Sequence, residues 1–311
     1  MPNTENQLVT TNTETTETTE TTETTKTTDL YKEIFILARD QMVKRLTNLI
    51  EVTPDQQAKQ QLNNLLRFAN PKRKGREEME DRWVIPVIRI VHGVTKEKPD
   101  GAEVGDICTT SGVILKQPFK ITPLYIYEQN RMFSDGGKAP VCFAPDAKYG
   151  RPFGICSKCV NYPMTKNATR TPTDCDNGIC FIVMSQDLRL YRIEFFKTSY
   201  KAGNKLDTLA CATDNIWDRW YTLKAQLQSG NGKEWHIFRV SSANEDTLEH
   251  VRDAADIIYD LIQAEREVHL KQHYLAASAA DQAISTVDEN VDMAQLGLDN
   301  TDNPDLTNSG I

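Results

Sequence analysis

The spacing of apolar residues divides the chain into a helical N-terminal part, a β-rich middle and a helical C-terminal part. From Asp29 to Ile50, apolar residues recur at steps of three and four, which predicts an amphipathic helix. Thr53 and Pro54 then predict a second helix, with threonine as its N-cap and proline at its first position, ending near Ala69. We therefore expect a pair of helices within residues 29–80.

Residues 81–242 alternate between apolar and polar positions or run through β-branched residues, which is typical of strands. The predicted strands are 83–91, 106–110, 113–116, 121–127, 180–184, 188–196, 217–227 and 235–240. Pro86 suggests an edge or a bulge for the first strand, and Thr198 or Ser199 is expected to cap a helix that runs to about Ala212. Short strands at this spacing predict a small antiparallel β-barrel or sandwich, so the fold class is α+β.

Residues 243–284 are predicted to form one long helix, capped by Asn244 or Asp246. Its apolar stripe consists of Leu248, Val251, Ala254, Ala255, Ile258, Leu261, Ile262 and Ala264. We expect this stripe to pack on the β-rich core. A coiled-coil dimer is the alternative, but no regular heptad continues along the segment.

The charge of the chain is unevenly distributed, and both ends are acidic. Residues 1–28 form a Thr/Glu repeat and residues 285–311 an acidic, Asn-rich tail, and both compositions are typical of disorder. The net charge is −8, yet the stretch 107–240 holds eighteen Lys and Arg against eleven Asp and Glu. A mildly basic body is therefore flanked by acidic ends. Since no apolar run approaches the ~20 residues of a membrane span, we expect no membrane partner.

Five of the seven cysteines lie between Cys142 and Cys180. Cys156 and Cys159 form a CxxC turn, and Cys175 follows after fifteen residues, most of which are polar or turn-forming. This spacing predicts a closed tetrahedral zinc site, whose metal would order a loop that buries little apolar surface. Such a site has no open coordination position, so the Zn²⁺ is expected to be structural.

Two other interpretations of the cysteines are less favoured, and one choice of ligand stays open. No signal peptide is recognisable, so we expect a reducing cytoplasm in which disulfides do not persist. A redox CxxC would need a surrounding βαβ pattern, which is absent from the sequence. The expected ligands are Cys142, Cys156, Cys159 and Cys175, with Cys180 in reserve because it opens an apolar strand.

The same loop carries basic residues interleaved with aromatic ones, a composition typical of single-stranded nucleic-acid binding. The predicted contact residues are Lys148, Tyr149, Arg151, Phe153, Lys158, Lys166 and Arg170. Tyr149 and Phe153 are the best candidates for base stacking, although aromatic residues on strands more often belong to the core. A second basic run at 72–76 is better explained as a solvated linker than as a phosphate-contacting arm.

The sequence offers no motif that points to catalysis. It has no GxxxxGK[ST] phosphate loop, and its five histidines do not cluster with acids as a nuclease site would require. We therefore expect a binding protein and not an enzyme.

From Trp83 onward, the order of these features resembles a group of bacteriophage proteins associated with single-stranded DNA binding. The shared residues include the Trp83-Val-Ile-Pro-Val-Ile-Arg-Ile run, Cys142-Phe-Ala-Pro-Asp146 and Gly154-Ile-Cys-Ser-Lys-Cys159. Further matches are the Pro172–Cys175 segment with its Phe-Ile-Val-Met strand and Trp235-His-Ile-Phe. The resemblance covers about half of the chain. It implies an OB-like barrel and favours Cys142 over Cys180 as the fourth ligand.

The resemblance also implies a phage-encoded protein that binds single-stranded DNA during replication or recombination in the cytoplasm of a host cell. The acidic tail would then be a docking site for replication or recombination proteins. The alternative is a zinc-stabilised protein-interaction or virion-associated module that does not bind nucleic acid. Salt dependence distinguishes the two, because phosphate contacts release counterions whereas a protein-docking surface need not.

Overall fold

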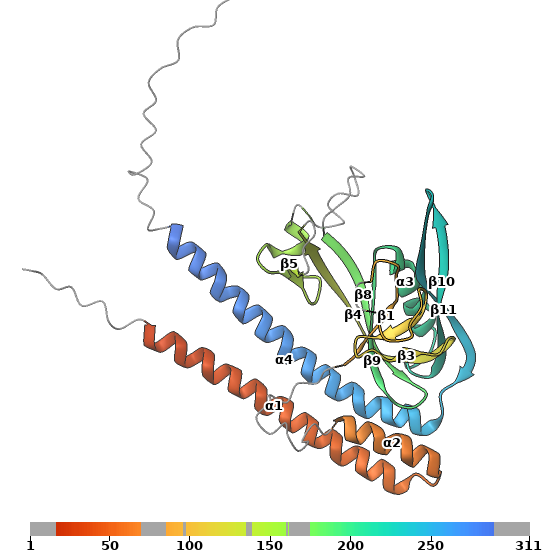
Figure 1. Cartoon of the computed structure of the whole chain (residues 1–311). Coiled ribbons are helices and arrows are strands. Elements are labelled where there is room, and N and C mark those ends of the chain that lie inside the picture. Colours follow the sequence, from red (N-terminus) through yellow and green to blue (C-terminus); the bar gives the residue numbers. More distant parts are fainter. Residues whose placement is uncertain are drawn as a thin grey trace, which may run out of the picture.

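The computed structural model describes residues 17–69, 85–95, 98–134, 139–159, 161 and 175–288, and its main body is a curled β-sheet with helices on both faces (Figure 1). The helices are α1 (Glu17–Val52), α2 (Gln56–Ala69), α3 (Tyr200–Ala210) and α4 (Glu249–Asp288). The strands of the main sheet are β1 (Val87–Ile90), β2 (Ile107–Thr109), β3 (Ile114–Leu115), β4 (Phe119–Phe133), β5 (Pro140–Ala144), β8 (Cys175–Ser185), β9 (Leu190–Phe196), β10 (Arg219–Gly230) and β11 (Lys233–Asp246).

The sheet is open, with the strand order β11-β10-β4-β8-β9-β1-β2-β3 and β5 paired to the far end of β4. All these pairs are antiparallel except β1 with β9, which is parallel. The α+β class is thus confirmed, whereas the predicted small antiparallel barrel is a curled sheet whose edge strands do not pair with each other. An OB-like fold is compatible with this curl.

Side-chain alternation along the strands gives the sheet two buried faces. On β8, Ile182 and Met184 contact α1, α2 and α4, while Phe181 and Val183 point into the curl, which α3 covers. Because successive side chains of a strand point to opposite faces, one strand can serve both cores. The N-terminal helical pair and the long C-terminal helix therefore pack on the outside of the curl.

Helices α1 and α4 lie side by side and extend together beyond the sheet (Figure 1). Arg45 of α1 bridges two carboxylates of α4, at 3.0 Å from Asp256 and in direct contact with Asp260. Among the described residues, no helix is long and apolar enough to cross a membrane.

The helix starts differ from those that the sequence predicts. Asp55, and not Thr53, caps α2: its Oδ1 accepts a hydrogen bond from the Ala58 N–H at 2.6 Å. Thr53 instead donates to the Leu49 carbonyl at the end of α1. Ser199 stands at the start of α3 but makes no side-chain cap there.

At the other long helix, the residues predicted as caps belong to a strand. Asn244 and Asp246 lie within β11, and α4 begins only at Glu249. Leu248 precedes the helix and is 63% exposed, so it does not belong to the buried stripe. The predicted start of this helix, at residue 243, is too early, because the strand residues before α4 include apolar and small side chains at helical spacing.

Two further elements are longer than predicted, and one strand lies in a different position. α1 begins at Glu17, inside the Thr/Glu repeat, since each residue added to an existing helix gains a hydrogen bond without a new nucleation cost. β4 continues to Phe133 through a polar stretch. β1 is an inner strand, and Pro86 precedes it, so the proline does not interrupt the ladder. The basic run at 72–76 lies outside the described residues.

The Ile258→Ala variant should lose about 2–5 kcal/mol of unfolding free energy, because Ile258 is 0% exposed between α4 and the sheet. Leu248→Ala, at a position that is 63% exposed, should change it by no more than about 0.5 kcal/mol. Urea unfolding followed by circular dichroism measures both. Equal losses in the two variants would contradict this assignment of the core.

Candidate metal centre and its basic surroundings

Strand pairing brings two of the predicted ligand cysteines to the same level of the sheet. Met132 of β4 is opposite Cys142 of β5 on one side and opposite Cys175 of β8 on the other. Two residues that pair with the same residue of the strand between them lie on the same face of the sheet. Cys142 and Cys175 therefore face the same side, although they are far apart in sequence.

The CxxC turn folds over this level of the sheet. The strands β6 (Tyr149–Gly150) and β7 (Gly154–Ile155) form a small hairpin that leads into a 3-10 turn, η1 (Cys156–Lys158). The Cys159 N–H donates to the Cys156 carbonyl at 3.0 Å, which closes the turn. We call the segment from β5 to η1 the knuckle.

Gly150 allows the knuckle to approach the thiols closely. A Cβ at this position would lie 2.6 Å from the Cys142 Sγ and 3.6 Å from the Cys156 Sγ. The first distance is shorter than any real Cβ contact, so a larger residue would have to displace the sulfur. This glycine also shows directly that the thiols of β5 and of the CxxC turn converge on one point.

The electrostatic environment of the thiols is consistent with the grouping of the four predicted ligands. Burial raises the pKa of Cys175 to about 12, and the nearby thiols of Cys142, Cys156 and Cys159 raise it further. Burial also raises the pKa of Cys142, with Cys156 and Cys159 adding to the effect while a hydrogen bond from the Phe153 backbone opposes it. Neighbouring thiolates repel one another, so these groups favour the protonated form unless a cation is present.

Cys180, the reserve ligand, lies elsewhere. It is fully buried on the opposite face of β8, and burial raises its pKa to about 12, with Glu194 as the next cause. The other charges that act on it are arginines, and no thiol is among them. The structure therefore groups Cys142 with the other three thiols and separates Cys180 from them.

The thiols are neighbours without forming a coordination sphere. All seven cysteines are described, and no two are joined by a disulfide. Within the described ranges, no three Cys, His, Asp or Glu side chains form a group that could hold a metal ion. Asn130 contributes a polar contact: it hydrogen-bonds to Cys156, which favours the thiolate, and accepts from Asn177 at 2.9 Å.

The middle of α4 holds the knuckle against the rest of the molecule. His273 Nε2 lies 3.1 Å from the Tyr149 carbonyl oxygen, and the Tyr274 hydroxyl donates to Asp146. Arg266 donates to the Pro145 carbonyl. No local sequence pattern predicts these contacts, because the helix pattern shows an apolar stripe but not which polar residues meet a distant loop.

The predicted DNA-contacting residues have different degrees of exposure. Lys148, Arg151 and Lys158 are exposed, and Phe153 is an aromatic residue at 51% exposure between them. Tyr149 is half-buried and packs edge-on against Tyr274, with ring centroids 6.0 Å apart. The other two predicted contact residues, Lys166 and Arg170, lie outside the described residues.

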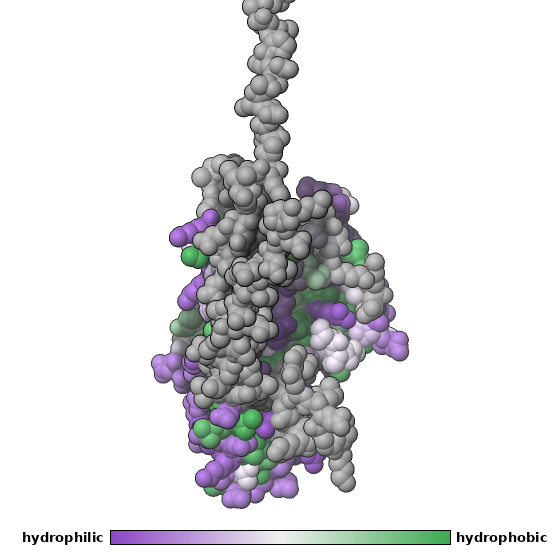
Figure 2. Space-filling view, turned by 90° about the vertical axis from the view of Figure 1, so that its left-hand side faces the viewer, coloured by the Kyte–Doolittle hydropathy of each residue, from purple (hydrophilic) through white to green (hydrophobic). Residues whose placement is uncertain are grey.

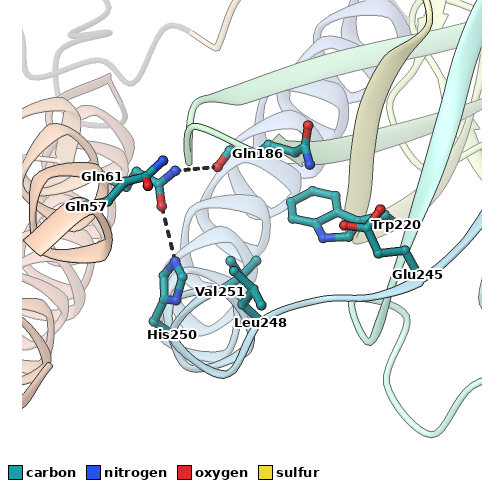
Figure 3. Close-up of a pocket in the computed structure, with 8 residues that line it drawn as sticks. All are labelled: Gln57, Gln61, Gln186, Trp220, Glu245, Leu248, His250 and Val251. Carbon is teal, nitrogen blue, oxygen red and sulfur yellow. Dashed lines mark hydrogen bonds between the residues drawn. The ribbon is translucent and has the colours of Figure 1, made fainter. Parts of the chain in front are cut away.

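A cavity of about 290 Å³ lies far from the knuckle, between α2, the β8–β9 turn and the start of α4 (Figure 3). It is lined by Gln57, Gln61, Gln186, Trp220, Glu245, Leu248, His250 and Val251. Gln61 donates to the Gln186 carbonyl at 3.0 Å, and its Oε1 lies 3.1 Å from the His250 Nε2. These bonds join three elements, so we interpret the cavity as a packing seam.

The Gly150→Ala variant should destabilise the knuckle by about 1–3 kcal/mol, because the added methyl group overlaps the Cys142 sulfur. Amide hydrogen exchange should increase at residues 142–159 and stay unchanged in the core. Gly93→Ala is the matched control, since a Cβ there meets nothing within 4 Å. Unchanged protection of the knuckle in Gly150→Ala would disprove the close approach.

Comparison with protein-family models, with curated proteins and with solved structures finds no match to this chain. The arrangement of thiols, basic residues and aromatic residues is therefore interpreted from its own chemistry.

Proposed function

We propose that this chain binds single-stranded DNA without sequence preference and that a structural Zn²⁺, held by Cys142, Cys156, Cys159 and Cys175, orders the surface that contacts the strand. The zinc carries no reaction in this proposal, and we propose no catalytic role for the chain.

The convergence of thiols supports the metal. Cys142 and Cys175 share one level of the sheet, and the Cys142 and Cys156 sulfurs both lie beside Gly150. A divalent cation would offset the mutual repulsion of four thiolates at this point. Asn130 is positioned to support one sulfur with a hydrogen bond.

One observation carries the DNA proposal: an aromatic side chain is exposed among exposed cations on a loop that the thiols anchor. Phe153 is 51% exposed, and Lys148, Arg151 and Lys158 surround it in sequence on the same knuckle. A base stacked on such a ring contributes about 1–3 kcal/mol, and lysine and arginine supply contacts to phosphate. Tyr149 already contacts Tyr274, so the proposal depends on Phe153 as the open platform.

The remaining parts of the proposal follow the resemblance to phage proteins. The chain would act in replication or recombination in the cytoplasm of a host cell, and the acidic tail at 285–311 would dock replication or recombination proteins. An acidic tail that competes with the DNA strand is consistent with the separation of the basic body from the acidic ends.

A specific observation favours a second candidate function, a zinc-stabilised protein-docking module. Val141 and Ile155 are 42% and 46% exposed on the same knuckle as Phe153. Three exposed apolar side chains on one small segment also suit a protein partner. The salt dependence of binding separates the two functions.

For the metal, the purified chain should contain about one zinc per molecule, and Cys156→Ser should lose most of it because three thiolates bind zinc much more weakly than four. Cys180→Ser should keep the full content, since Cys180 lies apart from the other thiols. Elemental analysis of both variants measures this. Retention of zinc by Cys156→Ser would remove the proposed ligand set.

For the DNA contact, the Phe153→Ala variant should bind a labelled ~30-mer single strand about 5- to 150-fold more weakly, because one stacking contact is lost. Val141→Ala on the same knuckle is the matched control and should bind as tightly as the parent chain. Fluorescence anisotropy at two salt concentrations measures both. A protein that shows no salt-dependent preference for single over double strands would favour the docking module.

A further inference from the structure

A group of arginines lies on the face of the sheet opposite to the thiols. Arg131 of β4 and Arg192 of β9 both point to the side that α4 covers, with Glu194 of β9 between them. Arg131 Nη1 and Arg192 Nε each lie 3.1 Å from a Glu194 oxygen. The alternation of side chains along β4 and β9 creates this group, because i and i+2 residues share a face.

Helix α4 adds cations to the same place. Arg266 lies over the ring of Tyr127 at 3.9 Å and, together with Arg131 and Arg192, acts on the buried Cys180. The positive charges of Arg266 and Arg192 also lower the pKa of His269 on α4, after burial as the first cause. The sheet and the helix therefore form two walls of one positively charged site, which we call the arginine site.

The charges of the described residues do not balance at this site. Glu194 is the one carboxylate that pairs with Arg131 and Arg192, and Asp176 nearby pairs with Lys197 at 3.2 Å. Glu265 of α4 does not compensate, because burial alone raises its pKa to about 7 and no cation lowers it. Three guanidinium groups thus share one carboxylate.

Aromatic packing holds Arg131 in place and leaves one of its hydrogen-bond donors unpaired. Arg131 stacks on the ring of Phe196 at 3.4 Å, and that ring occupies space left by Gly178, where a Cβ would lie 2.3 Å from it. Among the described residues, the buried Arg131 Nε has no hydrogen-bond partner, whereas the Arg192 Nε faces Glu194. Because buried donors are normally satisfied, the unpaired donor of Arg131 favours an additional acceptor at this site.

We propose that the arginine site binds phosphate groups of a phosphodiester backbone, between the outer face of β4 and β9 and the middle of α4. Planar, preorganised guanidinium groups match the oxygens of a phosphate with paired hydrogen bonds, and aromatic rings beneath them keep the planes fixed. Arg192, whose side chain is 41% exposed, offers access from solvent. In Figure 2, hydrophilic and hydrophobic residues are interspersed over the lower end of the molecule.

This inference rests on the proposed function and extends it, because it adds a second contact surface on the other side of the same strands. The knuckle lies at one end of β4, and Arg266 connects the two surfaces by donating to Pro145 of the knuckle. A strand that stacks on Phe153 would then continue toward the helix α4 side. The arginine site supplies backbone contacts and no base recognition.

The test compares Arg192→Gln with Arg192→Lys, and with Arg219→Gln as the matched control, whose side chain is 54% exposed and pairs with Asp246 at another position. In the full-length chain, Arg192→Gln should bind a labelled dT oligomer about tenfold more weakly. The slope of log affinity against log salt should become shallower by about 0.7. Arg192→Lys should recover part of the loss, and Arg219→Gln should match the parent chain.

A second measurement distinguishes the two proposals. Inorganic pyrophosphate should raise the melting temperature of the parent chain and of Arg219→Gln, but not that of Arg192→Gln. Parent-like binding of the oligomer by Arg192→Gln, at the same salt slope, would overturn the arginine site while leaving DNA binding intact. A parent chain that responds to pyrophosphate but not to the oligomer would overturn both DNA binding and the backbone assignment.

Discussion

The structure depends on the long strand β4. It is fifteen residues long and pairs with β8 along most of its length, with β10 at its start and with β5 at its end. The alternation of its side chains sends Ile121 and Leu124 into different cores, with a bulge near Leu124 that shifts the register. β4 thus contributes side chains to both cores, and its far end pairs with β5, which positions the knuckle.

The knuckle itself has little capacity to hold its shape without help. Its hairpin consists of two two-residue strands, and several of its apolar side chains face solvent. Such a segment buries too little apolar surface to offset the entropy of ordering its backbone. Side chains of α4 hold the knuckle on one side, and the thiols converge on the other. The proposed zinc would add binding energy where hydrophobic burial is weakest.

Sequence patterns predicted the elements whose apolar residues repeat regularly. The strands predicted at 180–184, 188–196, 217–227 and 235–240 are confirmed as parts of β8, β9, β10 and β11, because side-chain alternation is a local signal. The end of β4 was missed, since Gln129 and Asn130 are polar although they are 5% and 2% exposed. Buried polar residues such as these are satisfied by tertiary contacts, which no local pattern contains.

The candidate surfaces differ in the same way. The CxxC spacing alone predicts that Cys156 and Cys159 are close together. Cys142 and Cys175 come close only because their strands, β5 and β8, both pair with β4 at Met132. No local sequence pattern predicts the arginine site, because its cations come from β4, β9 and α4 and are brought together only by the fold. Functional residues that cluster within one loop can be recognised from the sequence. Residues that cluster across several strands can be recognised only when the register of strand pairing is known.

Two charged surfaces on opposite faces of the same strands impose a physical constraint on any ligand. Cys175 and Cys180 lie on the same strand, yet one belongs to the thiol group and the other to the arginine site. Because the two cysteines lie on opposite faces of β8, the two sites can be changed independently. A polyanion that contacts both must pass around the end of the sheet where α4 meets Pro145 and Asp146. The contacts of α4 with the knuckle therefore fix the relative orientation of the two surfaces, and a flexible single strand can follow that bend more easily than a stiff duplex.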